Sequence, residues 1–540
     1  MSYNLPTRKL VSQADQSMIQ RPDVPRSRFQ GSWTAKKTFD AGYLVPFLCD
    51  EILPGDHMKY DVTAYVRMAT PLFPMFDNQR IDTFFFYVPN RIVWENWQRF
   101  MGQQTNPTDT INYQVPQVLS AVGGFLQNTV YDHFGIPVAP QTSVAETMGV
   151  NALPLRAYNL IYNDWFRDEN LINSAVVPLG NGPDSVGTYN TLKRAKSHDY
   201  FTTALPWPQK FTAPNVPLSG NAPIMGIGIG GTYSFPDSNV TVMQSDGLIA
   251  NFPNARQTSV ASAIYVRGQN AGPGAPPAIF ADLSSQSVGI AINAFRQAML
   301  VQTLLERDAR GGTRYTEIIK NHFGVTSPDS RLQRPEYIGG GATPLTLTPV
   351  AQTAPTAGVP VGALGAAGTA AGTHSASYAA TEHGFIIGLI NVRSELSYQQ
   401  GLHKMWSRSL RYDYYWPSLA GLGEQAVLRK EIYSTGAFAN DSVVFGYQER
   451  WQEYRTRYSE ITGKFRSYAT GTLDPWHLSQ RFLTAPVLGQ AFVEDTPPMD
   501  RVLAAGALAA NQQYLADILI RREAVRPIPV YGTPASLMRF

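Results

Sequence analysis

The sequence predicts a mainly β protein, an antiparallel sandwich whose strands are joined by very long connections. Strand-like alternation clusters towards the two ends of the chain, and helical spacing is confined to a few segments between them. The 44 Gly and 39 Pro residues provide abundant turns. Strands separated by long irregular segments are typical of sandwiches and barrels, whereas parallel α/β folds alternate strands with helices regularly.

The first strands are predicted soon after Thr38, and the clearest runs over residues 58–68. Its even-numbered residues, including Tyr60 and Val66, are all apolar, while most odd-numbered residues are polar. This period of two predicts a strand with one buried face. The next run, DTFFFYV at 82–88, is apolar on both faces, which predicts a strand covered from both sides.

Helical spacing of apolar residues is found in a smaller number of segments. The predicted helices are 90–101, 153–167, 288–310 and 313–323. The longest of them ends at Gly311 and Gly312, and glycine favours helix termination. Strand patterns return at 384–393, 443–455 and 514–522.

Two interior stretches interrupt this pattern. Residues 212–287 are rich in Gly, Pro, Asn and Ser, and residues 339–381 consist almost entirely of Ala, Gly, Thr, Pro and Val. Structureless segments of this length are rare in compact domains. We therefore interpret 212–287 as a surface insertion and 339–381 as an Ala/Gly/Thr-rich loop, both outside the core.

The composition predicts a protein that packs against other chains. Charged residues make up 16% of the sequence, against roughly 25% in typical soluble domains; a large, weakly charged monomer is the alternative. Cys49 is the only cysteine, which excludes an intrachain disulfide and a thiolate metal cluster. No apolar run approaches the roughly 18–20 residues needed to span a bilayer, so we expect no membrane insertion.

The net charge of +3 is unevenly distributed along the chain. Both ends of the sequence are basic, and the middle is mildly acidic. Residues 1–37 are polar and punctuated by proline, which predicts an extended basic N-terminal arm. Basic ends suit an inward-facing contact with nucleic acid, and solvated termini are the alternative. The candidate DNA-binding residues are Arg8, Lys9, Arg21, Arg26, Arg28, Lys36, Lys37, Arg521, Arg522 and Arg526. Trp33, within the arm, is a candidate for base stacking.

No motif indicates catalysis. The GIGIGG run at 226–231 is followed by no helix, so it lacks the strand-turn-helix context of a dinucleotide site. The eight histidines show no HxxxH or HExxH spacing, and no GxSxG elbow is present. We therefore expect no enzymatic activity, no catalytic residues, no cofactor and no metal.

Several longer blocks resemble the major capsid proteins of gokushovirus-type bacteriophages (Microviridae). They include ATPLFPMFDN (69–78), DTFFFYVPNR (82–91), HDYFTTALPWPQK (198–210), MWSRSLRYDYYWPSLA (405–420) and RPIPVYGTPASL (526–537). Together with other blocks they run through most of the chain in the expected order. Residues 212–287 and 339–381 depart from the family pattern.

The resemblance implies an eight-stranded antiparallel jelly roll over residues 38–540 with long helical and loop insertions. It implies sixty copies in a T=1 icosahedral shell around circular single-stranded DNA. An internal scaffolding protein and a DNA-pilot minor capsid protein would be partners. The chain would be found in the virion and, before assembly, in the host bacterial cytoplasm.

The resemblance also implies a protrusion at the threefold axis, formed by an insertion that contacts a bacterial surface receptor. Residues 212–287 are the stronger candidate for this protrusion, and 339–381 the weaker one. Two other functions remain as alternatives. An aromatic-rich sandwich can bind or hydrolyse carbohydrate, and a basic, aromatic protein can bind single-stranded DNA as a monomer.

Overall fold

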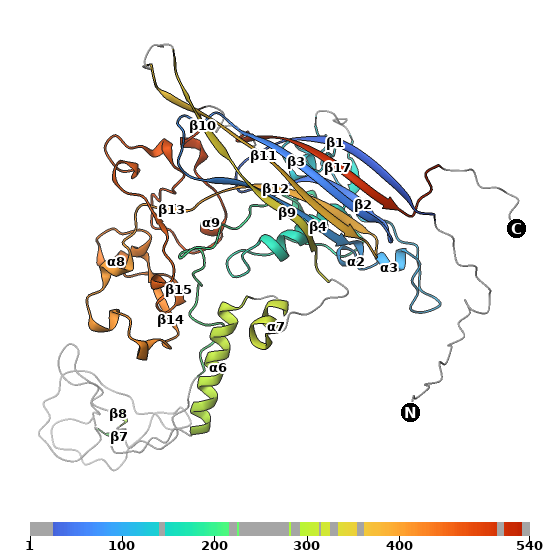
Figure 1. The fold of residues 1–540 in the computed structure, drawn as a ribbon. Coiled ribbons are helices and arrows are strands. Elements are labelled where there is room, and N and C mark those ends of the chain that lie inside the picture. Colours follow the sequence, from blue (N-terminus) through green and yellow to red (C-terminus); the bar gives the residue numbers. More distant parts are fainter. Residues whose placement is uncertain are drawn as a thin grey trace, which may run out of the picture. The chain divides into compact units, whose positions relative to one another are not determined.

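The computed structural model describes residues 25–139, 146–214, 224–225, 280–281, 292–312, 315–324, 333–353, 361–504 and 512–531. The chain divides into two compact units. The smaller unit, Gln209–Arg310, contains helix α6 (Ile292–Arg310) and the short strand pair β7 (Ile224–Met225) and β8 (Phe280–Ala281). The larger unit, Met1–Pro208 with Gly311–Phe540, contains the main sheets (Figure 1).

Eight long strands build the larger unit. In chain order they are β1 (Ser27–Phe39), β2 (Val45–Ile52), β3 (His57–Met68), β4 (Gln79–Pro89), β9 (Glu336–Pro344), β11 (Leu364–Ala379), β12 (Gly384–Ser394) and β17 (Tyr514–Arg526). All their pairings are antiparallel. A further strand, β10 (Thr346–Ala351), pairs with β11.

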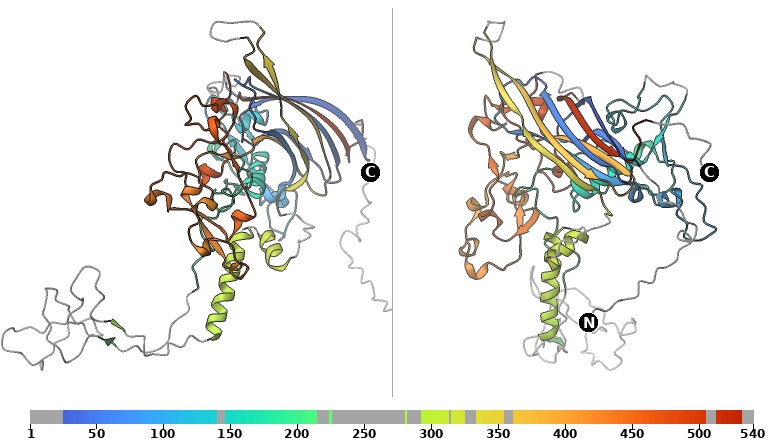
Figure 2. Two further views of the ribbon diagram at one scale, coloured as in Figure 1. Left: turned by 60° about the vertical axis from the view of Figure 1, so that its left-hand side comes forward. Right: turned by 45° about the vertical axis from the view of Figure 1, so that its right-hand side comes forward.

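These strands form two layers of four. The first layer has the order β1-β17-β3-β11 and the second β9-β4-β12-β2, and the two are joined where Ala376 of β11 pairs with Gly339 of β9. Each layer therefore combines strands from both ends of the sequence, and this is the topology of a jelly roll. The predicted eight-stranded antiparallel jelly roll is confirmed. Figure 2 shows the strands of the first layer side by side as one curved sheet.

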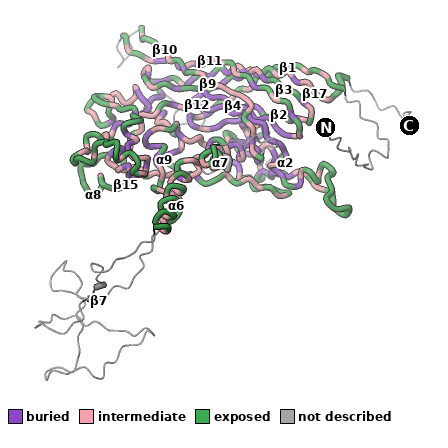
Figure 3. Tube along the Cα trace, turned by 60° about the horizontal axis from the view of Figure 1, so that its bottom comes forward, coloured by how far each residue is buried: buried purple, intermediate pink, exposed green. Residues whose placement is uncertain are grey.

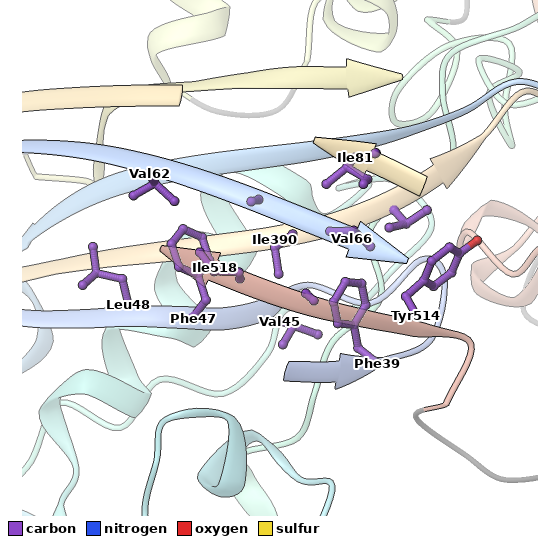
Figure 4. Packing of buried hydrophobic residues seen from close by; sticks show 14 of the residues in the cluster. Phe39, Val45, Phe47, Leu48, Val62, Val66, Ile81, Ile390, Tyr514 and Ile518 are labelled. Carbon is purple, nitrogen blue, oxygen red and sulfur yellow. The ribbon is translucent and has the colours of Figure 1, made fainter. Parts of the chain in front are cut away.

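The main core lies between the two layers. The even-numbered residues of β3 and the even-numbered apolar residues of β17 are buried, among them Val62, Val66 and Ile518. They belong to the same apolar cluster as Phe47 of β2 and Ile390 of β12 (Figure 4). The alternation predicted for residues 58–68 is thus confirmed, and its apolar face is the one that packs against the second layer.

The second layer is buried on its other face as well. Phe84 and Phe86 of β4 point away from the first layer and contact Phe166 with ring centroids 5.0 and 5.7 Å apart. Phe166 ends the π-helical turn η1 (Tyr162–Phe166), which continues helix α5 (Leu153–Ile161). The prediction that DTFFFYV forms a strand covered from both sides is confirmed, as is the predicted helix that begins at Leu153. Figure 3 shows β4 and β12 largely in the colour of buried residues.

A buried ion pair holds α5 in this position. The Arg156 side chain is fully buried and donates two hydrogen bonds to the Asp184 carboxylate, at 2.7 and 2.8 Å. Its remaining donors reach the carbonyls of Val93 and Gly180, and the Tyr189 hydroxyl donates to Asp184 at 2.6 Å. These hydrogen bonds and the opposite charges offset the cost of removing both groups from water.

Smaller elements complete the larger unit. The helices are α2 (Asn90–Val93), α3 (Trp97–Phe100), α4 (Val130–His133), α7 (Tyr315–Phe323), α8 (Phe438–Asp441) and α9 (Gln490–Val493). The short strands are β5 (Gln117–Leu119), β6 (Gly149–Asn151), β13 (Ser397–Tyr398), β14 (Glu424–Leu428), β15 (Val444–Glu449) and β16 (Ser459–Glu460). The 3-10 turns are η2 (Val186–Thr188), η3 (Lys404–Ser407), η4 (Arg411–Asp413), η5 (Pro417–Leu419), η6 (Arg429–Glu431), η7 (Gln452–Tyr454), η8 (Gly463–Phe465), η9 (Asp474–Trp476) and η10 (Met499–Arg501).

The interpretation of residues 339–381 as a loop is wrong, because β9, β10 and β11 occupy most of them. Ala, Gly and Thr alternate there without the contrast of apolar and polar side chains that identifies a strand. The small residues are required by close packing: a side chain at Gly340 would collide with the Thr83 carbonyl, and one at Gly372 with the Thr343 side chain.

Three other boundaries also need correction. The predicted arm of residues 1–37 ends too late, since β1 begins at Ser27; residues 1–24 lie outside the described residues. The helix predicted over 90–101 is two short helices, α2 and α3, separated by extended backbone at the fully buried Trp94. The strand predicted over 443–455 ends at Glu449. Nearly all of the predicted insertion 212–287 lies outside the described residues.

Replacement of Arg156 by Met should destabilise the larger unit by about 3–5 kcal/mol, because Asp184 would remain buried without its cation. The measurement is urea unfolding of the unassembled protein, followed by tryptophan fluorescence. The double variant Arg156→Met/Asp184→Leu removes both charges and should recover much of the loss. A loss below about 1 kcal/mol in the single variant would contradict this role of the ion pair.

Candidate nucleic-acid interface

The pairing of β1 with β17 brings the two basic ends of the sequence together. The strands are in register along their whole length, from Ser27 opposite Arg526 to Phe39 opposite Tyr514. Six of the ten predicted DNA-binding residues lie on these two strands. They are Arg28, Lys36, Lys37, Arg521, Arg522 and Arg526. Strand pairing therefore places residues that are nearly 500 positions apart in one small region.

Side-chain alternation divides these six residues between two faces. Residues directly opposite each other in antiparallel strands project to the same side. Arg28, Lys36 and Arg521 share a side with the odd-numbered residues of β17 and β3, and all three are exposed. We call this side the outer face of the first layer. Lys37 and Arg522 project to the opposite side, towards the second layer.

The outer face carries a moderate excess of positive charge. Its cations are Arg28, Lys36, Lys59, Arg67 and Arg521, and its carboxylates are Asp61, Asp517 and Glu523. Arg28 forms an ion pair with Glu523 at 2.6 Å, in which both side chains remain more than one third exposed. Such an exposed pair is worth at most about 1 kcal/mol, so Arg28 can exchange this partner for a phosphate at little cost.

Small hydroxyl side chains extend the outer face across β11. Thr373, Ser375 and Ser377 lie opposite the odd-numbered residues of β3, and the Thr63 and Thr373 hydroxyls are 2.9 Å apart. Short polar side chains leave the sheet surface accessible to a nucleic-acid backbone and can donate hydrogen bonds to phosphate oxygens.

Arg522 is held by intramolecular contacts instead. Its guanidinium donates to Asp50 at 2.8 Å and stacks 5.4 Å from the centre of the Trp33 ring. Asp50 also accepts a hydrogen bond of 2.7 Å from the Tyr60 hydroxyl. Burial and the adjacent carboxylate raise the pKa of Tyr60, so this hydroxyl keeps its proton. One face of Trp33, the residue considered for base stacking, is thus occupied by Arg522.

Arg526 and Lys37 are also engaged within the subunit. Arg526 donates to the buried Asp56 carboxylate at 2.9–3.0 Å and to the Glu51 carbonyl at 2.5 Å. The Lys37 ammonium donates to the His133 carbonyl at 2.6 Å, and burial lowers its pKa. Arg522 and Arg526 connect β17 to the region of β2, and Lys37 connects β1 to helix α4. Their geometry favours a structural role over contact with DNA.

The remaining predicted residues precede β1. Arg26 is described and exposed, whereas Arg8, Lys9 and Arg21 lie outside the described residues. The DNA-binding residues predicted from the sequence did not include Lys59 and Arg67. Both share the outer face with Lys36 and Arg521. The signal was present, because alternation in residues 58–68 already places both cations on the polar side of that strand.

The described residues offer little for chemistry on a small molecule. In this part of the chain no group of three or more His, Cys, Asp or Glu side chains could hold a metal ion. Among the same residues, no helix combines the length and apolar character required to cross a membrane. The jelly roll is an architecture that virus coat subunits share with lectin domains and cupins.

Comparison with known proteins identifies the family. The model of the family described as "Capsid protein (F protein)" matches residues 17–536, and the chain belongs to this family. It is a structural capsid protein rather than an enzyme, and the resemblance to gokushovirus-type capsid proteins is confirmed.

Three relatives cover almost the whole chain, and each is named capsid protein VP1. The protein of Bdellovibrio phage phiMH2K is 45% identical over 98% of this chain and 100% of its own length. Those of Chlamydia phage 1 and Spiroplasma virus 4 are 38% and 34% identical, each over 96% of this chain and 97% of its own length.

The burial of His133 in helix α4 predicts a loss of stability in acid. Burial, with a smaller contribution from Lys37, lowers the pKa of His133 to about 4, whereas an unfolded histidine titrates near 6.5. The folded protein therefore binds this proton more weakly. The contribution of His133 to stability is complete above pH 6.5 and is lost as the pH falls towards 4.

The measurement is the free energy of unfolding of the unassembled protein at pH 7 and pH 5, for wild type and His133→Gln. The wild type should lose about 2 kcal/mol more than the variant over this interval. The same substitution at His57, an exposed residue of β3, should leave the wild-type difference unchanged. Equal losses in wild type and His133→Gln would contradict the prediction.

Proposed function

We propose that this capsid protein assembles as sixty copies into a T=1 icosahedral shell around circular single-stranded DNA. The observation that carries the proposal is similarity over nearly the full chain to three proteins named capsid protein VP1. A closed shell requires one subunit to present several surfaces to identical copies. The low charged fraction of 16% supports this, because the centres of interfaces between subunits are depleted of charge.

The proposal includes further partners and a location. An internal scaffolding protein would guide assembly, and a DNA-pilot minor capsid protein would accompany the genome. The chain would reside in the host bacterial cytoplasm before assembly and in the virion afterwards. Sedimentation and negative-stain microscopy of the purified protein test the central claim. Megadalton shells support it, and small species at every concentration count against it.

The DNA contact is proposed to use the arm together with the outer face of the first layer. Residues 1–26 carry Arg8, Lys9, Arg21 and Arg26 and precede β1, whose outer face carries Arg28 and Lys36. Packaged phosphates need neutralisation without reading of sequence, which exposed Lys and Arg side chains provide through counterion release.

Replacement of Arg8, Lys9, Arg21, Arg26 and Arg28 by Ser should weaken the salt dependence of single-stranded DNA binding. Each phosphate contact contributes about −0.7 to the slope of log K against log salt concentration, so the slope should become shallower by up to about 3.5. The measurement is fluorescence anisotropy of labelled oligo(dT) with the full chain between 50 and 300 mM salt. Thermal unfolding should be nearly unchanged.

The matched control is Arg522→Ser/Arg526→Ser. These arginines form ion pairs with Asp50 and Asp56, so their loss should lower the unfolding temperature and leave the slope as in wild type. An unchanged slope in the arm variant, or a reduced slope in the control, would contradict the proposed division of roles.

Residues 212–287 are proposed to form a protrusion at the threefold axis and to contact a bacterial surface receptor. Their Gly-, Pro-, Asn- and Ser-rich composition and their location within the separate unit Gln209–Arg310 support an excursion from the capsid core. Replacement by a short Gly-Ser linker should leave shells visible in micrographs and reduce adsorption of the phage to cells at least tenfold. Failure of shell assembly would contradict a purely external role.

A carbohydrate-binding sandwich was the alternative from sequence alone. Membership of the capsid protein family argues against it, and no finding on this chain favours it.

A further inference from the structure

A surface rich in exposed aromatic rings lies between β12 and β17 in the sequence, in residues 408–416 and 450–454. Tyr412, Tyr414, Tyr415, Trp416 and Tyr454 are 40–65% exposed. The neighbouring strands β14 and β15 are drawn in orange in Figure 1. Aromatic side chains are normally more buried than this in a monomer, and contiguous apolar patches of several hundred Å² mark interaction sites.

Two arginines each stack on two of these rings. The Arg408 guanidinium lies 4.3 Å from the ring centre of Tyr454 and 5.6 Å from that of Tyr414. The Arg411 guanidinium lies 4.9 Å from the ring centre of Trp416 and 5.9 Å from that of Tyr412. The ring centre of Tyr415 lies 6.3 Å from that of Tyr454, and we call these six residues together with Tyr415 the aromatic–arginine surface. Stacking of guanidinium on aromatic rings keeps the surface flat and restricts its rotamers.

The backbone beneath this surface is held in place before any partner binds. The Asp413 carboxylate accepts hydrogen bonds from the backbone amides of Ser409 and Leu410, both at 2.8 Å. Arg408 forms an ion pair with the buried Glu453 at 3.1 Å. A surface ordered in advance loses little conformational entropy when it is covered.

The size of the exposed aromatic area fits a protein partner. A buried Tyr or Trp covers about 150–250 Å², so the five exposed rings offer roughly 500 Å². A standard interface uses about 800 Å² from each partner. Tyr, Trp and Arg are also the residue types that dominate binding energy at the centres of protein interfaces.

The charge of this region argues against nucleic acid as the partner. Arg408 is neutralised by Glu453, and the adjacent Lys404 lies 3.7 Å from Glu431. Two cations of the region remain, Arg411 and Arg450, and the Asp413 carboxylate partly compensates them. A surface whose cations are largely compensated attracts phosphate weakly, whereas binding of single strands depends on an excess of positive charge.

We propose that the aromatic–arginine surface is a contact between subunits and binds a second copy of this chain. The inference rests on the proposed function, because a shell built from one kind of subunit supplies that copy as the partner. The energy of association would then come in part from this surface. The surface belongs to the insertion between β12 and β17 and not to the strands of the jelly roll.

The experiment measures self-association of the full chain by sedimentation velocity over a range of concentrations, for wild type and Tyr412→Ser. Tyr412 is 65% exposed, so its loss should leave thermal unfolding nearly unchanged. The concentration at which half the subunits are associated should rise tenfold or more. Tyr412→Phe keeps the ring and should associate within about twofold of wild type. Tyr65→Ser, at a 48% exposed tyrosine on the outer face of the first layer, should also match wild type.

Other results overturn the proposal. Normal association by Tyr412→Ser would exclude this surface as a subunit contact. If the variant associates normally but binds oligo(dT) more weakly than wild type, the surface serves nucleic acid. If the wild-type protein associates only into dimers or other open oligomers, the proposed closed shell is refuted. The comparison of wild type with Tyr412→Ser would still test whether this surface is a subunit contact. A wild type that remains monomeric at every concentration would overturn both.

Discussion

The position of β17 between β1 and β3 is the constraint on which the rest of this subunit depends. It pairs with β1 over Tyr514–Arg526 and with β3 over residues 514–525, and five of its even-numbered side chains lie in the core between the layers. Without it β1 would be separated from the rest of the first layer, and β3 would keep only its pairing with β11. Because β17 lies at the far end of the sequence from its two neighbours, this layer can close only after long-range pairing, which is slow and entropically expensive.

The same pairing decides what the basic residues do. Alternation along β1 and β17 directs Arg28, Lys36 and Arg521 to the outer face and the adjacent cations inwards. Asp50 and Asp56 receive the inward arginines as internal ion pairs. A list of basic residues therefore overestimates the number of cations on the outer face. The relevant property is which side of a strand each cation occupies, and neighbours such as Arg521 and Arg522 have opposite roles.

Aromatic residues are likewise divided by their surroundings. Phe84 and Phe86 are covered by α5 and η1 and stabilise the second layer within one subunit. Residues 412–416 are equally aromatic but remain exposed, on a backbone held by Asp413 and by the pair of Arg408 with Glu453. A capsid subunit needs both kinds of aromatic cluster, since its own stability and its association with other copies are separate requirements.

The sequence by itself determined the strand at 58–68, the doubly covered strand at 82–88, the helix that begins at Leu153 and the family. Each depends on a local pattern or on long ordered blocks of residues. Only the tertiary structure decided that residues 339–381 contribute β9, β10 and β11, that β1 begins at Ser27, and that Arg522 and Arg526 are internal. The physical reason is that these features depend on partners distant in sequence. Small residues carry no hydrophobic periodicity until a neighbouring strand is present, and the role of a cation depends on which carboxylate the fold brings to it.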